Sequence, residues 1–361
     1  MTFCPIRPRP LKSVTWVKLW LPLLISTLAA APLRAEELSV RYEASHQAMG
    51  TAFTVVAYGR NPKYLDQVVN EAFEEIDRLD AQMSNYRPES ELAGINRNAA
   101  RRPVLVEPRL FQLLRDSLRY SGETAGAFDV TVGPLMKAWG FFRGQGRVPS
   151  RAELAEVLKR VGYRHLKLDQ AQRQIQFDAE GIGLDLGGIA KGYAVDQAVE
   201  ILRANGVSSA LVSSGTSSFY ALGAPPGERG WKITVRDPYE AEKVGDIAYL
   251  KDYSLSASGN YEKFFKLGGK TYCHIMDPRT GRPVENMLST VVLAPRATQS
   301  DALSTAFFVL GVAGSRKYLA THPDLTALFY QPTATKGRFK RVVLRSTSFT
   351  AAPESLAEFA R

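Results

Sequence analysis

A glycine-rich segment, residues 181–191, has the composition of a turn that could bind an anion. Its glycines are at positions 181, 183, 187 and 188, and Lys191 adds a positive charge. The apolar periodicity of residues 189–202 predicts a helix directly after this turn. Glycine at a helix start lets backbone N–H groups approach an anion, which the helix dipole also favours. A tight turn with a solvated lysine explains the same residues equally well.

Asp301 and Thr305 are four residues apart in a stretch, residues 301–310, that we expect to be helical. Side chains at this spacing lie on one helix face, one turn apart, so two oxygen donors can reach one cation. Magnesium suits such a pair, because it takes a carboxylate with neutral oxygens and completes its octahedron with water and ligand phosphates. Taken alone, the spacing is more simply explained by an aspartate that follows Ser300 near a helix N-terminus.

His274 lies in a stretch, residues 272–281, that is typical of a strand running into a proline and glycine turn. Loops of this kind often carry functional residues. The imidazole could position or deprotonate a hydroxyl nucleophile. A core histidine that is hydrogen-bonded to the backbone is an equally good interpretation.

Several enzyme classes are excluded because their motifs are incomplete. A phosphate-binding P-loop that ends at Gly269-Lys270-Thr271 would need glycine at position 264, which is Phe264. The dinucleotide-binding fingerprint that begins at Gly181 would need glycine where Leu186 stands. No G-x-S-x-G hydrolase motif occurs, and four widely separated histidines do not suit a structural zinc site.

The N-terminus has the layout of a secretory signal peptide, which we expect to cover residues 1–35. An apolar run at residues 19–31 lies among basic residues without any acid, namely Arg7, Arg9, Lys12, Lys18 and Arg34. The run is shorter than the roughly 20 residues of a membrane span, so an uncleaved anchor is the less favoured alternative. Cleavage could follow Ala31 or Ala35, and Ala35 is favoured because an acidic stretch begins at Glu36.

If the signal peptide is removed on export, the net charge and the number of cysteines must be counted again for the mature chain. Of the 46 lysines and arginines, five lie in residues 1–35, so 41 remain against 36 acidic residues, a net charge of +5. No Lys/Arg-rich run stands out, and we expect no nucleic-acid partner. Cys4 precedes the apolar run and cannot be a lipidated first residue. Its removal leaves Cys273 alone, so the mature chain must fold without an internal disulfide.

The remaining pattern predicts one α+β domain, residues 36–361, with mixed helices and largely antiparallel sheets. Helices are expected at residues 65–83, after Asn61-Pro62, and at 108–121, and a capping box at 150–153 opens a third. Strands are expected at residues 51–58, 174–178, 209–213, 231–235, 246–255, 290–293 and 325–330. The last 30 residues show no clear pattern.

Seven pieces of the sequence, in order, resemble the FAD:protein FMN transferase (ApbE) family over roughly residues 45–330. They are residues 49–51, 83–96 (with MSNYRP, SEL and Asn96), 126–135, 185–196, 258–261, 274–278 and 300–305. The resemblance implies a T-fold-like α+β architecture. Each piece is weak by itself, and their common order carries the resemblance.

The resemblance implies a role for particular residues. FAD contacts are implied for Met49, Tyr86, Ala127, Phe128, Asp129, Asp185, Lys191 and Ile275, the last through its backbone. Magnesium ligands are implied at the Gly188 carbonyl, Asp301, Ser304 and Thr305. His274 is our candidate for activating the attacking hydroxyl.

The implied reaction transfers the FMN part of FAD to a threonine or serine hydroxyl of an acceptor protein, with release of AMP and with Mg²⁺ bound. The family's acceptors are exported or membrane-bound redox flavoprotein subunits, so we expect a periplasmic enzyme that can associate with the inner membrane. Hydrolysis of FAD to FMN and AMP, and a periplasmic flavin-binding protein without turnover, are the alternatives. One segment departs from the family: residues 213–217 have one glycine and no acid, where the family shows paired glycines and an acid.

Overall fold

The structure, a computed structural model, describes residues 39–346 and 355–360. The expected signal peptide and Cys4 lie outside these residues. From Ser39 onward the described residues belong to one compact unit. No helix in this part of the chain has the length and apolar character that crossing a membrane requires.

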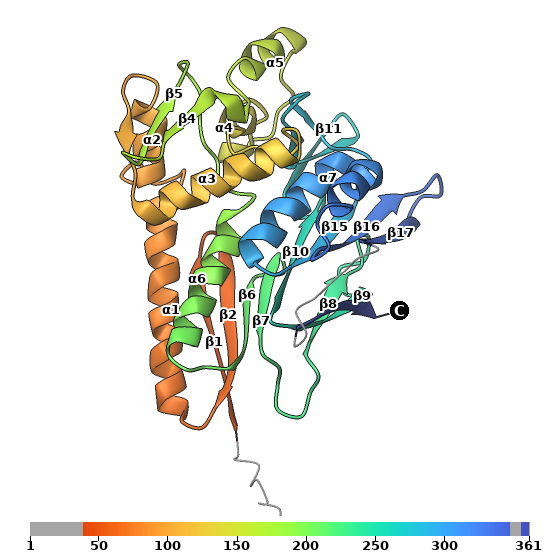
Figure 1. The fold of residues 1–361 in the computed structure, drawn as a ribbon. Helices are drawn as coiled ribbons and strands as arrows, with labels where there is room; N and C mark the ends of the chain where they lie inside the picture. The colour runs from red at the N-terminus through yellow and green to blue at the C-terminus, as the bar shows by residue number, and fades with distance from the viewer. Residues whose placement is uncertain (1–38, 347–354, 361) are drawn as a thin grey trace, which may run out of the picture. The chain divides into compact units, whose positions relative to one another are not determined.

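An eight-stranded sheet, in which every neighbouring pair is antiparallel, forms the centre of the fold (Figure 1). Its strands, in spatial order, are β1 (Val40–Ala48), β2 (Thr51–Gly59), β6 (Ser209–Ser214), β7 (Ser218–Leu222), β10 (Tyr253–Gly259), β15 (Ser289–Ala294), β16 (Thr326–Pro332) and β17 (Phe339–Arg345). Helices α1 (Pro62–Met83), α6 (Ala190–Ala204) and α7 (Ala297–Leu319) cover one face. The predicted α+β class is confirmed.

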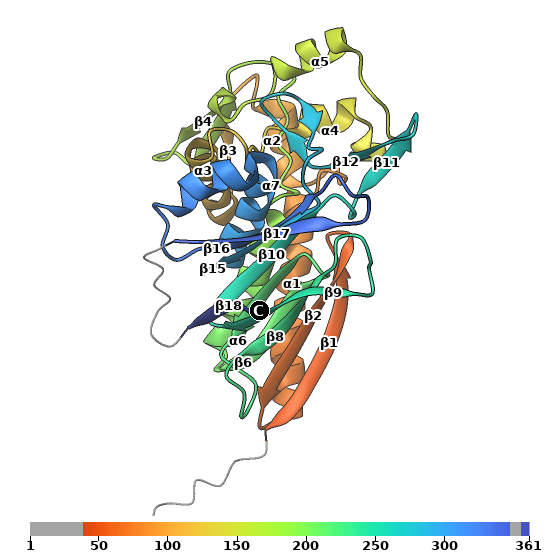
Figure 2. The same ribbon diagram turned by 90° about the vertical axis from the view of Figure 1, so that its right-hand side faces the viewer.

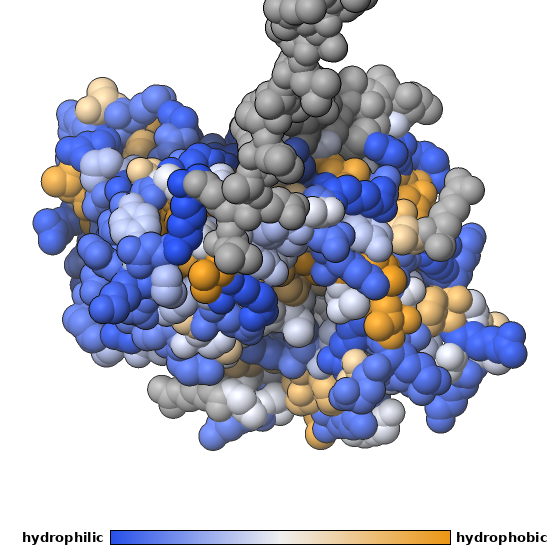
Figure 3. Space-filling view, turned by 90° about the horizontal axis from the view of Figure 1, so that it is seen from below, coloured by the Kyte–Doolittle hydropathy of each residue, from blue (hydrophilic) through white to orange (hydrophobic). Residues whose placement is uncertain are grey.

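The other face of the sheet packs against a smaller antiparallel sheet, β18-β9-β8 (Figure 2). Its strands are β8 (Trp231–Arg236), β9 (Val244–Lys251) and β18 (Leu356–Ala360). Trp231 and Ile233 of β8 are buried against Leu255 and Leu328 of the large sheet. The surface seen from below in Figure 3 is mostly polar, with apolar residues scattered in it, as expected away from such cores.

Short elements cover the end of the sheet where α6 begins. They are α2 (Glu91–Asn98), β3 (Val104–Leu105), α3 (Pro108–Glu123), α4 (Gly133–Ala138), η1 (Phe141–Arg143), α5 (Arg151–Leu158), η2 (Tyr163–His165), β4 (Leu166–Asp169) and β5 (Gln174–Phe177). Two ribbons join them: β11 (Phe264–Leu267) with β12 (Lys270–Cys273), and β13 (Met276–Asp277) with β14 (Arg282–Pro283). At α5 the Ser150 hydroxyl accepts a hydrogen bond from the Glu153 N–H, as the capping box predicts.

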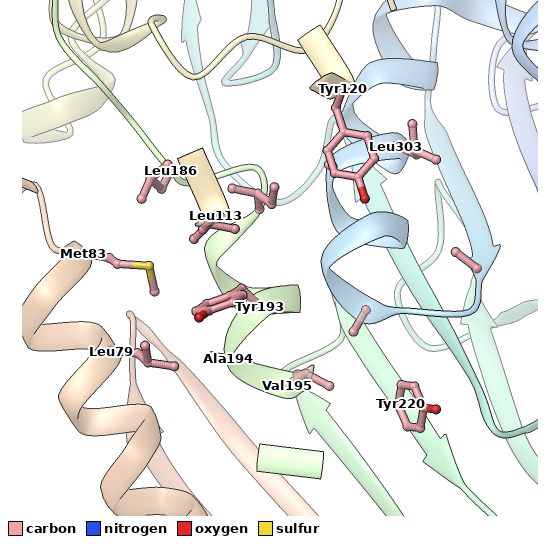
Figure 4. Close-up of a cluster of buried hydrophobic side chains, with 14 of the residues drawn as sticks. Leu79, Met83, Leu113, Tyr120, Leu186, Tyr193, Ala194, Val195, Tyr220 and Leu303 are labelled. Carbon is pink, nitrogen blue, oxygen red and sulfur yellow. The ribbon is translucent and has the colours of Figure 1, made fainter. Parts of the chain in front are cut away.

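Helix α1 illustrates how the local sequence selects a helix with one buried face. The Asn61 side chain accepts hydrogen bonds from the Lys63 and Tyr64 N–H groups, and Pro62 stands where a missing N–H costs nothing. The buried residues recur at three and four: Leu65, Val68, Val69, Ala72, Phe73, Ile76, Leu79 and Met83. Figure 4 shows Leu79 and Met83 beside Tyr193 of α6. Each large apolar side chain buried in this way contributes roughly 1.5–3 kcal/mol.

Two of the predicted elements have different bounds in the structure. The single strand expected at residues 246–255 is wrong, because β9 and β10 belong to different sheets and are separated at Asp252. Asp252 has φ 51°, and its carboxylate accepts a hydrogen bond from the Gly223 N–H, which fixes the break. The helix expected at 301–310 starts earlier, at Ala297, and continues beyond a kink at Gly311 (φ 65°) to Leu319.

Helices α6 and α7 cap each other. Neither helix has a side-chain cap from its own N-cap residue, Ile189 or Arg296. Instead, the Gly192 N–H in the first turn of α6 donates to Oδ2 of Asp301 on α7, at 2.8 Å. Asp196 on α6 accepts in turn from the first N–H groups of α7, those of residues 297 and 298, at 2.8 and 2.9 Å. Each buried carboxylate therefore satisfies N–H donors of the other helix.

Gly192 has no room for a side chain at this contact, because an added Cβ would lie 2.2 Å from the Ala297 carbonyl oxygen and 2.6 Å from Cβ of Asp301. We predict that Gly192→Ala destabilises the protein by about 3 kcal/mol, since backbone must move to relieve the overlap. Gly94→Ala is the matched control, because that helical position is open and alanine should be neutral or stabilising by up to about 1 kcal/mol. Urea unfolding of both variants measures the difference, and equal stabilities would refute the close contact.

Candidate active site

The glycine-rich segment is held by the layer above the sheet before it enters α6. The Asp185 N–H donates to the Val130 carbonyl at 2.7 Å, and the Gly133 N–H donates to the Gly183 carbonyl at 3.1 Å. Oδ1 of Asp185 accepts from the Gly187 N–H at 2.8 Å. The predicted turn before a helix is therefore present, and its aspartate is fixed in place by backbone contacts.

Asn96 also holds this segment, although the sequence gives no hint of how. Its carboxamide bonds both backbone groups of Leu184: the oxygen accepts from the Leu184 N–H at 2.7 Å, and the nitrogen donates to the Leu184 carbonyl at 3.1 Å. The same nitrogen donates to Asn85, beside Tyr86, at 3.2 Å. Asn96 thus ties the turn that carries Tyr86 to the segment that carries Asp185.

Gly188, Asp301 and Thr305 come together at the junction of α6 and α7. An added Cβ on Gly188 would lie 3.3 Å from the Thr305 hydroxyl, so the backbone there lies directly against Thr305. Asp301 is 4% exposed and accepts the Gly192 hydrogen bond, and burial raises the pKa of its carboxyl even though the Lys191 charge opposes this. A buried carboxylate, a hydroxyl and a backbone carbonyl make a hard oxygen donor set that fits Mg²⁺.

Hydrogen bonds between hydroxyl groups join α7 to strand β10. The hydroxyls belong to Ser254, Ser256 and Ser258 on β10 and to Ser300, Ser304 and Thr305 on α7. The Ser304 hydroxyl is fully buried, lies 2.8 Å from the Ser258 hydroxyl and donates to the Asp301 carbonyl at 2.9 Å. The partly exposed Thr305 hydroxyl is 3.3 Å from Ser258. Of the two hydroxyls, that of Thr305 is the better placed to reach a cation.

His274 is held in one tautomer by the backbone. Its Nδ1 lies 3.1 Å from the Lys263 carbonyl, which can only accept, so Nδ1 carries the proton and Nε2 presents a lone pair. Burial lowers the pKa of His274 to about 4, and the nearby charges of Lys263 and Lys191 act in the same direction. The imidazole is therefore neutral at physiological pH, which suits a proton acceptor.

Three lysines bring positive charge to these groups. Lys191 lies close enough to Asp301 and His274 to influence the pKa of both. Burial raises the pKa of Asp185, and the charges of Lys263 and Lys137 oppose this rise. Because the charges of these lysines act on Asp185, His274 and Asp301, the junction favours an anionic ligand.

The order of sequence pieces, the sheet topology and this junction of α6 with α7 agree with one family. A sequence model of the ApbE family matches residues 49–329. This chain belongs to the ApbE family. The FAD:protein FMN transferase of Treponema pallidum (strain Nichols) is 34% identical to it over 307 residues, which cover 81% of this chain and 84% of that protein. That of Escherichia coli (strain K12) is 31% identical over 269 residues, covering 73% and 76%.

Solved ApbE structures share the fold. The ApbE protein from Thermotoga maritima superimposes with a TM-score of 0.76 at 32% identity, covering 86% of this chain and 98% of that chain. The flavin transferase ApbE from Vibrio cholerae gives a TM-score of 0.73 at 28% identity, covering 86% and 99%.

The two aromatic residues that the ApbE resemblance singles out, Tyr86 and Phe128, differ in exposure. Tyr86 is 68% exposed and stacks on Phe142, with ring centroids 4.9 Å apart. A pocket of about 470 Å³ lies beside this pair, lined by Lys137, Gly140, Phe142, Gln145 and Arg147. Phe128 is buried, and its ring reaches to 3.4 Å from where a Gly188 Cβ would be. Phe128 can therefore shape the junction, while Tyr86 presents an open aromatic face.

Three other residues that the ApbE resemblance singles out are buried or hydrogen-bonded to backbone groups in the structure. Asp129 accepts hydrogen bonds from the Thr131 N–H and hydroxyl and from the Tyr163 N–H, so its carboxylate joins two loops. Ala127 beside it is buried, and the Ile275 carbonyl accepts from the Val284 N–H at 3.0 Å. The structure thus shows what holds these three residues in place, and their contacts with FAD stay predictions.

Two turns meet at the end of the sheet near Asp301. Met49 and Gly50, with φ 51° and 73°, form the two-residue turn between β1 and β2. In the departing segment the Gly215 N–H donates to the Ala52 carbonyl at 2.7 Å. Burial raises the pKa of Asp301, and the side chain of Ser218, just beyond that segment, partly offsets this rise. The segment that differs from the ApbE pattern therefore packs against the Met49 hairpin.

The lowered pKa of His274 makes a prediction about stability. Because the unfolded chain takes up this proton near pH 6.5 and the folded chain only near pH 4, stability should fall as the pH drops through that window. We predict that the wild type loses roughly 2 kcal/mol more unfolding free energy between pH 7 and pH 5 than His274→Gln does. Urea unfolding at the two pH values measures this. Equal losses would show that His274 titrates like a solvated histidine.

Proposed function

We propose that this chain transfers the FMN moiety of FAD to a threonine or serine hydroxyl of an acceptor flavoprotein, with release of AMP and with Mg²⁺ bound. One observation supports this more than any other: Gly188, Asp301 and Thr305 converge beside Lys191 at the start of α6. A phosphate-bearing ligand with a hard cation matches this combination of donors and charge. The chain belongs to the ApbE family, and its relatives are named FAD:protein FMN transferases, so we take the proposed reaction from them.

In the proposed reaction, the acceptor hydroxyl oxygen bonds to the phosphorus on the FMN side of the pyrophosphate, and the bond from that phosphorus to the AMP oxygen breaks. Nε2 of His274 takes the hydroxyl proton, because its lone pair is free and the ring is neutral. Lys191 offsets negative charge on the phosphoryl oxygens and the departing AMP.

The cation would be held by the Gly188 carbonyl, Asp301 and Thr305, and when bound it supplies further positive charge to the pyrophosphate. Ser304 is linked to Thr305 through the Ser258 hydroxyl, and its role as a further ligand stays a prediction. Asp185 and Tyr86 would contact the flavin side. Burial raises the pKa of the Tyr86 phenol, and the charge of Asp185 reaches it and adds to the rise.

We also propose that the enzyme works in the periplasm on redox subunits that are exported or bound to the inner membrane. The support is the signal-like composition of residues 1–35. Fractionation of cells that express the full chain tests this proposal, and activity confined to the cytoplasm would contradict it.

The function is tested by incubating the mature protein with FAD, Mg²⁺ and peptides of about twelve residues that contain one central threonine. Mass spectrometry should find the mass of one FMN on the threonine, with an equal amount of AMP released. Free FMN with unmodified peptides would indicate hydrolysis of FAD, and unchanged FAD would indicate binding alone.

Asp301→Asn separates the two roles of this carboxylate. The amide oxygen can still accept the Gly192 hydrogen bond, but the charge that would hold the cation is lost. We predict that the variant folds, loses Mg²⁺ affinity by calorimetry and turns over at least about a hundredfold more slowly. Asp116→Ala, on α3, is the control and should behave as the wild type. Normal Mg²⁺ affinity in Asp301→Asn would remove this residue from the metal site.

A further inference from the structure

The β11–β12 hairpin is an exposed element that the proposed reaction leaves unused. It is a two-stranded ribbon that pairs with no other strand in the described ranges, and it projects from the side of the molecule (Figure 2). Phe264 and Leu267 on it are 47% and 51% exposed. An unpaired ribbon that also exposes large apolar side chains suggests an interaction surface.

The two faces of the hairpin differ. Phe265 and Tyr272 are paired across the strands and stack with ring centroids 5.0 Å apart, and Phe265 lies 5.3 Å from Phe141. An added Cβ on Gly146 would lie 2.3 Å from the Phe265 ring, so Phe265 is seated on the η1 region, while Leu267, farther along the same face, is exposed. Because side chains alternate along a strand, Phe264 and Lys266 share the opposite, outward face.

The hairpin is continuous with the candidate active site. Lys263, just before β11, accepts through its carbonyl from both the N–H and Nδ1 of His274, which directly follows β12. The ring of His274 lies 6.5 Å from Phe141, on which the hairpin packs. Any protein that brings a hydroxyl to Nε2 of His274 must therefore approach beside this hairpin.

The hairpin carries a positive charge that has no ion-pair partner among the described residues. Lys270 is paired with Glu285 at 2.6 Å, whereas the described residues place no carboxylate within ion-pair distance of Lys266. The Lys266 ammonium lies instead 5.9 Å from the Phe264 ring centroid. The outward face thus offers an aromatic ring next to an unpaired cation, which is complementary to an apolar side chain beside an acidic one.

We propose that the outward face of the hairpin, Phe264 with Lys266, docks the acceptor segment that carries the modified hydroxyl, and that this segment has apolar and acidic residues next to the target. The inference rests on the transferase function proposed above. A protein occupant is favoured over a lipid surface. The base of the hairpin is joined by the hydrogen bonds between His274 and Lys263, and in the proposed reaction it is the acceptor protein that must reach His274.

The test uses two threonine peptides of about twelve residues, one with acidic and apolar residues around the threonine and one in which lysines replace the acids. The wild type should modify the acidic peptide with a roughly tenfold higher kcat/KM. Phe264→Ser and Lys266→Glu should each raise the KM for that peptide roughly tenfold, and Lys266→Glu should favour the lysine peptide. FAD affinity, measured by flavin fluorescence, should change less than about twofold, since neither side chain lies at the α6–α7 junction.

Leu105→Ser and Lys336→Glu are the matched controls, because they make the same kinds of change at other exposed positions and should leave both peptides unaffected. If transfer proceeds and the hairpin variants behave like these controls, the docking surface is wrong and the transferase function stands. If the variants lose only their binding to phosphatidylethanolamine–phosphatidylglycerol vesicles, the hairpin is a membrane contact and the inference is overturned. If the wild type modifies no acceptor, the proposed function falls and the inference falls with it.

Discussion

The mutual capping of α6 and α7 is the contact on which the candidate active site depends. Two buried carboxylates, Asp196 and Asp301, each satisfy N–H groups at the start of the other helix. Burying a carboxylate is costly unless it is hydrogen-bonded or paired with charge, so neither helix can shift without leaving one of them unsatisfied. Gly192 makes the approach close enough, because any side chain there would overlap Ala297. The two helix starts are consequently held in one relative position.

This constraint explains how a site can be assembled from distant parts of the chain. The glycine-rich turn reaches α6 after being fixed by Val130 and Asn96, and α7 is fixed to β10 by buried hydroxyls. When the two helices cap each other, the backbone of Gly188 meets Thr305, and Lys191 comes close to Asp301. The carboxylate that caps α6 is also the one proposed to hold the cation. In this proposal, one residue couples helix capping with cation binding.

Local patterns could predict the parts of this arrangement that depend on neighbouring residues: the buried stripe of α1, the turn before α6, and the shared helix face of Asp301 and Thr305. They could not predict contacts between residues far apart in sequence. Asn96 bonds Leu184, and Asp196 caps residues 297 and 298, which no spacing rule connects. Motif matching singles out Asp129 and Ser304, but it could not predict that Asp129 bonds Thr131 and Tyr163 or that Ser304 bonds the Asp301 carbonyl. The break at Asp252 depends on which sheet each strand joins, and alternation cannot show that.

The central claim is that the α6–α7 junction is one half-buried site for a divalent cation and the FAD pyrophosphate. Anomalous diffraction from crystals soaked with Mn²⁺ and FAD tests it most directly, because manganese accepts the same oxygen ligands and scatters anomalously. The account predicts a manganese peak bound by Asp301, the Thr305 hydroxyl and the Gly188 carbonyl, with the pyrophosphate of FAD on the same ion and near Lys191. Ordered FAD with its pyrophosphate elsewhere, or a manganese ion bound away from Asp301, would contradict it.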